Sequence, residues 1–124
     1  MEKVKVGYFD SPGVTGNYSI TGLGFKPRII HFYGSKNDGL QTWYHSSQSF
    51  VDINGNQVCN SFTGNYSNTY RGDNQIRTDR CIYLFAGGGA VQVNASFVSM
   101  DDDGFTLKFN NTNSIFRIRY QAIG

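Results

Sequence analysis

The chain has 124 residues, 39% of them hydrophobic and 15% aromatic, which is enough for one domain with its own core. Only 16% of the residues are charged and the net charge is +2, which argues against nucleic acid as a partner because phosphate binding needs a dense basic patch. The charged N-terminus lacks the apolar core of a signal peptide, and no apolar run is long enough to span a bilayer. We therefore expect a single domain, residues 1–124, made in a cytoplasm, without general secretion or membrane insertion.

Apolar and polar residues alternate with a period of two in short runs that Gly, Asn and Pro interrupt, which predicts short β-strands. The first part of the chain is predicted to form strands at Lys3–Phe9, Asn17–Thr21, Arg28–Tyr33, Thr42–Ser46, Phe50–Ile53 and Gln57–Asn60. Asn54-Gly55 joins the last two and is the dipeptide most typical of a tight hairpin turn. No stretch has helical periodicity, so we expect an all-β fold of the sandwich or barrel type.

The segment Ser61–Asp79 is polar, rich in Gly and Asn and poorly patterned, which predicts a long loop. Its residues Thr63–Ser67 repeat the TGNYS of Thr15–Ser19, but five residues are too few to establish a duplication. Charges of both signs in and beside this segment predict a solvated mixed-charge surface: Arg71, Asp73, Arg77, Asp79 and Arg80.

Two further strands are predicted at Arg80–Phe85 and Ala90–Met100. The strictest alternation comes last, with apolar residues at Phe105, Leu107, Phe109, Phe116, Ile118, Tyr120 and Ala122. Asp103-Gly104 opens the first of these two runs, and a polar segment joins it to the second. We therefore expect a hairpin that ends the chain. The side chains expected to be buried on one face of it are Phe105, Leu107, Ile118 and Tyr120.

The two cysteines, Cys59 and Cys81, lie far apart in sequence and lack the close pairing of a zinc motif. Each lies on a predicted strand. They are either two small buried side chains or a disulfide between neighbouring strands. A cytoplasmic origin favours the first alternative.

No segment carries a catalytic signature, so we expect neither an enzyme nor a bound metal or cofactor. His31 lies in an apolar strand and is predicted to be packed or hydrogen-bonded rather than a base. Asp101–Asp103 are consecutive, so their carboxylates cannot converge on a calcium ion, and a solvated turn is predicted. Gly87–Gly89 lacks the helix and the Lys-Ser/Thr pair of a phosphate loop.

Two motifs bracket most of the chain: TGNYSITGLGFKPRIIHF at Thr15–Phe32, and ASFVSMDDDGFTLKF followed by RIRYQAIG near the C-terminus. Together they resemble a family of small β-sandwich modules in phage and prophage virion proteins, often at tail-fibre ends. The pattern is more distantly similar to the H-type lectin domain, a trimeric sugar-binding β-sandwich. The resemblance implies an antiparallel β-sandwich of the H-type-lectin-like or phage fibre-tip type. It also implies a homotrimer. Gly34–Asp79 departs from the pattern.

Candidate binding residues come from two places. Trp43, the only tryptophan, stands with Tyr44 and His45, and an aromatic face beside polar groups suits a sugar ring. The alternative for Trp43 is a place in the core. The second set, Tyr66, Tyr70, Arg71 and Asp73, rests on its position in the predicted loop alone.

Two functions remain open. The first is a bacteriophage virion structural or accessory protein, such as a capsid decoration or tail accessory subunit, with a capacity to bind glycans. The second is a carbohydrate- or receptor-binding, lectin-like module of a tail fibre or tail tip. The expected partners are further copies of the chain, other virion proteins and a host-surface glycan, and the expected location is the virion.

Overall fold

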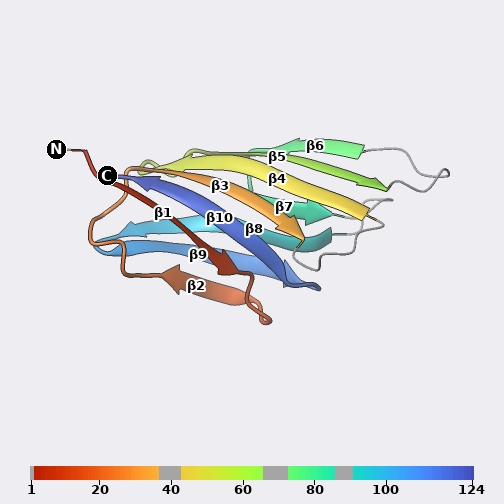
Figure 1. Cartoon of the computed structure of the whole chain (residues 1–124), viewed down its shortest axis with the longest axis horizontal. Helices are drawn as coiled ribbons and strands as arrows, with labels where there is room; N and C mark the ends of the chain where they lie inside the picture. Colours follow the sequence, from red (N-terminus) through yellow and green to blue (C-terminus); the bar gives the residue numbers. More distant parts are fainter. Residues whose placement is uncertain (1, 37–42, 66–72, 86–90) are drawn as a thin grey trace.

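The computed structural model describes residues 2–36, 43–65, 73–85 and 91–124, and every regular element in these ranges is a β-strand (Figure 1). Within them the strands are β1 (Val4–Asp10), β2 (Gly16–Ile20), β3 (Ile29–Lys36), β4 (Trp43–Asp52), β5 (Gln57–Asn65), β6 (Asp73–Arg77), β7 (Ile82–Phe85), β8 (Val91–Asp101), β9 (Gly104–Thr112) and β10 (Phe116–Ile123). The predicted all-β class is therefore confirmed for the described part of the chain.

The strands form two sheets, in which all the described pairings are antiparallel. The large sheet has six strands in the order β1-β10-β3-β4-β5-β6, and the small sheet has four in the order β2-β9-β8-β7. Figure 1 shows the two sheets stacked in a sandwich-like arrangement, with both chain termini at the same end. We call this the terminal end. The turn between β4 and β5 and the turn between β8 and β9 also lie there.

The core fills the space between the sheets and is mainly aromatic. The Phe105 ring of the small sheet packs edge-on against Tyr120 and Phe32 of the large sheet, with ring centroids 5.3 and 5.5 Å apart. Ile118 is fully buried beside them, while Tyr120 is 8% exposed. Such offset aromatic contacts add to the free energy of burial. The alternating positions predicted to be buried at the C-terminus are therefore the centre of the core.

The predicted terminal hairpin is wrong. β9 pairs with β2 and β8, while β10 pairs with β1 and β3, so the last two strands belong to different sheets. Their apolar faces meet across the core. Alternation identifies the buried face of each strand but does not show which strand it pairs with. Two strands have the same alternation whether they pair in one sheet or face each other from two sheets. Asp103-Gly104 opens β9, as predicted, and completes the turn of the β8–β9 hairpin, in which Asp101 pairs with Gly104.

Two further predictions need correction, for a shared reason. The predicted strands Thr42–Ser46 and Phe50–Ile53 are parts of one strand, β4, although Thr42 itself lies outside the described residues. The predicted loop Ser61–Asp79 contains the end of β5 and all of β6. In β4 and β5 small polar side chains face inward: Ser47, Ser61 and Thr63 are at most 2% exposed. Polar inward positions remove the hydrophobic alternation on which strand prediction depends.

The terminal end is held by hydrogen bonds from two turns. The Asn54-Gly55 hairpin is confirmed, with the Gly55 amide donating to the Asp52 carbonyl over 3.0 Å. At the β8–β9 turn the Asp103 carboxylate accepts hydrogen bonds from the amides of Gly22 (3.0 Å) and Gly24 (2.7 Å). Asp102 and Asp103 are exposed, as a solvated turn predicts, but Asp103 also ties the β2–β3 connection to the small sheet.

Candidate functional site

The candidate residues from sequence fall at the end of the large sheet opposite the terminal end. Trp43, Tyr44 and His45 are the first residues of β4, and Asp73 is the first residue of β6. Their side chains lie outside the described part of the structure, as do Tyr66, Tyr70 and Arg71 altogether. Whether any of them binds a ligand therefore stays a prediction.

The backbone register nevertheless brings the two candidate sets together. His45 of β4 and Asp73 of β6 both pair with Thr63 of β5, one from each side. Residues from the two sets therefore occupy one row across three adjacent strands, although they are far apart in sequence. Sequence reasoning missed this proximity because β6 was taken for part of a loop.

The outer face of the large sheet, which points away from the small sheet, carries a row of aromatic and cationic residues. Tyr8 of β1 pairs with Arg119 of β10, which pairs in turn with Tyr33 of β3. In the adjacent row Gln121 pairs with His31, and His31 pairs with Phe50 of β4. All five strand neighbours Tyr8, Arg119, Tyr33, His31 and Phe50 are exposed. His31, predicted to be packed or hydrogen-bonded, is not buried: it lies on the solvent side of β3, where its ring lies 6.4 Å from that of Phe50.

A shallow depression of about 200 Å³ lies on this face between β3 and β10. His31, Tyr33, Arg119 and Gln121 line it, together with the intervening residues Phe32 and Tyr120. Among the described residues Arg119 has no ion pair or hydrogen-bonded side-chain partner, so its guanidinium is available to a ligand or a protein partner. Arginine and tyrosine are the residue types most often found at the energetic centre of protein interfaces.

The neighbouring arginine is already occupied. Arg117 donates to the Asp10 carboxylate over 3.1 Å, and its guanidinium lies 4.3 Å from the centre of the Tyr8 ring. The hydrogen bond to Asp10 raises the pKa of Arg117 above its usual value. Arg117 therefore holds Asp10 and Tyr8 in place and leaves Arg119 as the available cation of the row.

Apolar side chains extend the outer face on both sides of the depression. More than a third of the surface is exposed on each of Val4, Val6, Tyr8, Ile29, Tyr33, Phe50, Phe62 and Ile76. By their pairings these residues all occupy the outer positions of the large sheet. Single exposed apolar residues are ordinary, but a group gathered over one sheet face marks an interaction surface.

The sequence carries only a local signal for this face. Arg117, Arg119 and Gln121 alternate with the buried positions of β10, which predicts a solvent-facing side of one strand and no more. Their cross-strand neighbours Tyr8 and Tyr33 lie more than 80 residues away in sequence. Only the strand order shows that these side chains form one surface.

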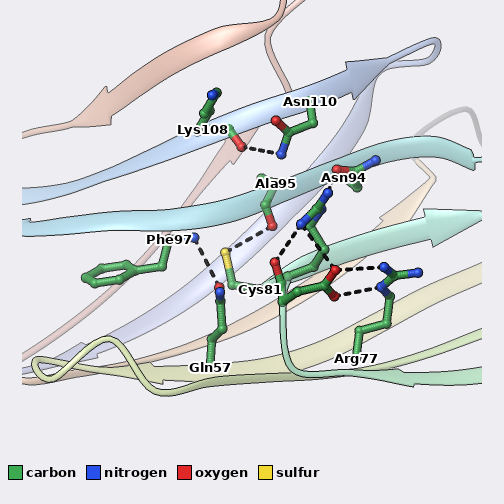
Figure 2. A network of polar contacts seen from close by, with 10 residues as sticks. Gln57, Arg77, Cys81, Asn94, Ala95, Phe97, Lys108 and Asn110 are labelled. Atoms are coloured by element: carbon green, nitrogen blue, oxygen red, sulfur yellow. Dashed lines mark hydrogen bonds and ion pairs between the residues drawn. The ribbon is translucent and has the colours of Figure 1, made fainter.

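The mixed-charge region around Arg77 proves to be an ordered network rather than a merely solvated surface (Figure 2). Arg77 donates two hydrogen bonds to the Asp79 carboxylate, at 2.9 and 2.8 Å, and Arg80 donates to the Asn94 side chain at 2.9 Å. These bonds lower the pKa of Asp79 to about 2, chiefly through Arg77. The network joins the end of β6 to β8 where the chain crosses between sheets, and we assign it a structural role.

Both cysteine thiols are free and fully buried, which confirms the prediction of two small buried side chains. Cys59 lies on β5, whereas Cys81 lies one residue before β7 rather than on a strand. The Cys59 sulfur lies 3.0 Å from the Ser47 hydroxyl oxygen, and burial raises the pKa of the Cys81 thiol. A buried thiol of raised pKa is a poor nucleophile.

In the described ranges no three His, Cys, Asp or Glu side chains gather as a metal site would require. The same residues include no helix long and apolar enough to cross a membrane. Comparison with protein-family models, with curated proteins and with solved structures found no match to this chain.

Proposed function

We propose that this chain is a bacteriophage virion structural or accessory protein, a small β-sandwich subunit that self-associates, as a homotrimer, through the outer face of its large sheet. It would serve as a capsid decoration or tail accessory subunit and bind other virion proteins. The observation that carries the proposal is the outer face, where exposed aromatic and aliphatic side chains surround Arg119, which has no ion-pair partner in the described part of the chain. No catalytic role is proposed.

The contacts between the motif segments support the phage-module part of the proposal. β2, from the TGNYSI segment, pairs with β9, from the DGFTL segment, and the Asp103 carboxylate binds the amides of Gly22 and Gly24. β3, from RIIHF, pairs with β10, from RIRYQAI. The residues that carry the resemblance are therefore spatial neighbours, as expected if they mark one shared folding unit.

The composition of the outer face supports association between copies. Tyrosine, phenylalanine and arginine are enriched in protein interfaces, and unpaired charges are depleted at their centres. Asp10, two residues after Tyr8 on β1, is already paired with Arg117. Arg119 is the charged group of this face for which a neighbouring copy would have to supply a partner.

Light scattering on paired charge-reversal variants tests the self-association. We expect the wild-type chain to have about three times the 13.9-kDa monomer mass, and Arg119→Glu to shift it toward monomer. Lys108→Glu is the matched control, because Lys108 is exposed on β9 of the small sheet, away from the outer face. A monomeric wild-type protein, or equal effects of the two variants, would contradict the proposed interface.

The virion assignment needs a separate measurement. Quantitative mass spectrometry of purified phage particles should detect the chain in a fixed number of copies per particle, as expected for a repeated subunit. Absence from the particles, with the protein free in the lysate, would contradict the virion role and leave the self-association result standing.

A further inference from the structure

A second concave site lies at the terminal end, away from the outer-face depression and the predicted site residues. It is a cleft of about 410 Å³, within the size range of small-molecule sites. One wall is the β4–β5 turn of the large sheet, and the other is the end of β8 in the small sheet. The residues that line it are Lys26, Ile53, Asn54, Gly55, Phe97, Val98, Ser99 and Met100. We call it the terminal cleft.

A β-bulge shapes the wall that β8 contributes. Phe97 pairs with Leu107 and Ser99 pairs with Thr106, so Val98 has no residue opposite it in the β8–β9 ladder. The extra residue leaves Val98 44% exposed beside the cleft. Bulges bend a strand, re-aim its side chains and are over-represented next to functional sites.

The two walls are fixed to one another. The side chain of Gln57, at the start of β5, accepts a hydrogen bond from the Phe97 amide over 3.1 Å. Figure 2 shows this bond and the Phe97 ring, which projects on the side of the β4–β5 turn. This bond restrains the two walls relative to one another, and such restraint reduces the entropic cost of binding.

The lining combines an apolar wall with polar groups at its rim. Phe97 supplies an aromatic ring, and Ile53 and Val98 supply exposed aliphatic surface. Lys26 has no ion pair with any residue in the described ranges, so its three N–H donors are available. The Asn54 side-chain amide offers both a donor and an acceptor. This mixture suits a ring that has one apolar face and an edge of hydroxyl groups.

The charges around the cleft decide between a neutral and an anionic ligand. The Asp101 carboxylate accepts a 2.6 Å hydrogen bond from Ser99, which is the main cause of its lowered pKa, and Lys26 lowers that pKa further. The positive charge of Lys26 is therefore offset by the Asp101 carboxylate, and the cleft offers an anionic ligand no unopposed positive charge.

We propose that the terminal cleft binds one ring of a neutral saccharide, with Phe97 and Val98 against the apolar face of the ring and with Lys26 and Asn54 bonded to its hydroxyl groups. This saccharide site goes beyond the proposed function and does not depend on the virion location or on the oligomeric state. It also lies at the opposite end of the large sheet from Trp43, Tyr44 and His45.

Amide chemical shifts of the ¹⁵N-labelled full chain test the proposal. The probes are methyl glycosides of neutral hexoses and N-acetylhexosamines, with glucuronate as the acidic probe, each titrated through the millimolar range. We expect at least one neutral glycoside to shift amides at residues 26, 53–55 and 97–100, and glucuronate to bind more weakly. Shifts at His31, Tyr33 and Arg119 instead, no shifts with any glycoside, or a preference for glucuronate would each overturn it.

Two variants separate binding from folding. Val98→Arg places a large charged side chain in the cleft and should abolish the amide shifts. Val14→Arg is the control and should leave the shifts unchanged, because Val14 is 73% exposed and lies between β1 and β2, at the end of the molecule opposite the terminal end. Lys26→Ala, a change at an exposed side chain, should weaken binding about fivefold through loss of a hydrogen bond. Unchanged affinity in both Val98→Arg and Lys26→Ala would overturn the site. Light scattering on the same samples reports the oligomer separately, so a failed saccharide site and a failed interface give different results.

Discussion

Gly104 shows how strictly one residue of the β8–β9 turn is constrained. A Cβ atom at this position would overlap the backbone carbonyl oxygen of Ile20 in β2, because β2 and β9 lie side by side there. The neighbour is backbone in a paired strand, so it cannot move aside as a flexible side chain would. The glycine of the DGFTL segment is therefore required for close approach and not for an unusual φ angle, since its φ is not positive.

We expect Gly104→Ala to lower the free energy of unfolding by about 1–3 kcal/mol, the usual range for overpacking. Gly13→Ala is the matched control, because nothing lies within 4 Å of a Cβ atom added there. Urea denaturation of the two variants measures the difference. Equal stability of both variants would show that β2 does not approach β9 as closely as described.

At the scale of the strand, β10 contributes closely packed side chains to the core from the interior of the large sheet. It lies between β1 and β3, and its inward residues Phe116, Ile118 and Ala122 are fully buried. The Cδ1 atom of Ile118 lies 3.1 Å from the position that a Cβ atom on Gly34 would occupy, so β3 packs closely against this side chain. Truncation there leaves a cavity that backbone strands on both sides cannot close.

Ile118→Ala should therefore cost about 2–5 kcal/mol in unfolding free energy. Ile115→Ala, three residues earlier and 52% exposed, should cost less than about 0.5 kcal/mol. Thermal or chemical denaturation followed by circular dichroism provides the comparison. Losses of similar size at the two positions would mean that the inward face of β10 is assigned incorrectly.

The network between β6 and β8 predicts a pH dependence. Because the folded pKa of Asp79 is lowered from 3.8 to about 2, the unfolded chain takes up its proton first as the pH falls. The stabilisation from Asp79 is complete above the unfolded pKa and is lost as the pH drops from about 4 to about 2. Asp79→Asn should be less stable than wild type at pH 6, with the gap closing toward pH 2. A gap that stays constant over this window would contradict the Arg77–Asp79 pairing.

The sequence predicted the strands whose inner face is apolar and failed where the inner face is polar. Phe105, Leu107, Ile118 and Tyr120 were identified as buried from alternation alone, and the Asn54-Gly55 turn from its dipeptide. β4 was divided in two and the end of β5 was missed because Ser47 and Ser61 face the core and satisfy their hydroxyl groups with local hydrogen bonds. β6 was missed because its one large apolar residue, Ile76, is exposed. Hydrophobic periodicity cannot detect a strand of that kind.

The candidate sites depend still more on long-range pairing. Arg119 and Tyr33 are adjacent only because β10 inserts between β1 and β3, and the terminal cleft exists only because the β4–β5 turn meets β8. Neither relation leaves a local trace in the sequence. The predicted site residues Trp43–His45 were chosen for residue type alone, which is why the outer face and the cleft were not among the predictions.

For the whole molecule, the composition of the outer face predicts how the proposed oligomer responds to salt. The outer face is rich in aromatic and aliphatic side chains, and of its carboxylates Asp10 is paired with Arg117, while Asp52 accepts hydrogen bonds from amides of its own turn. We expect the oligomer to persist, or to become more stable, when NaCl is raised from about 0.1 to about 1 M, because salt screens charge pairs and does not weaken apolar burial. Light scattering at the two salt concentrations measures this, and dissociation at high salt would show that ion pairs hold the copies together.

The position of β1 has a consequence for biosynthesis. In the described sheet its neighbour is β10, so the first of the described strands in sequence pairs with the last. Until Phe116–Ile123 emerges, Val4, Val6 and Tyr8 belong to a strand without a partner. Contacts of such long sequence separation slow folding, typically to the range of milliseconds to seconds for all-β domains. During synthesis β1 therefore has an unpaired apolar edge until β10 has emerged, and the yield in a cell should depend on chaperones that shield this edge until then.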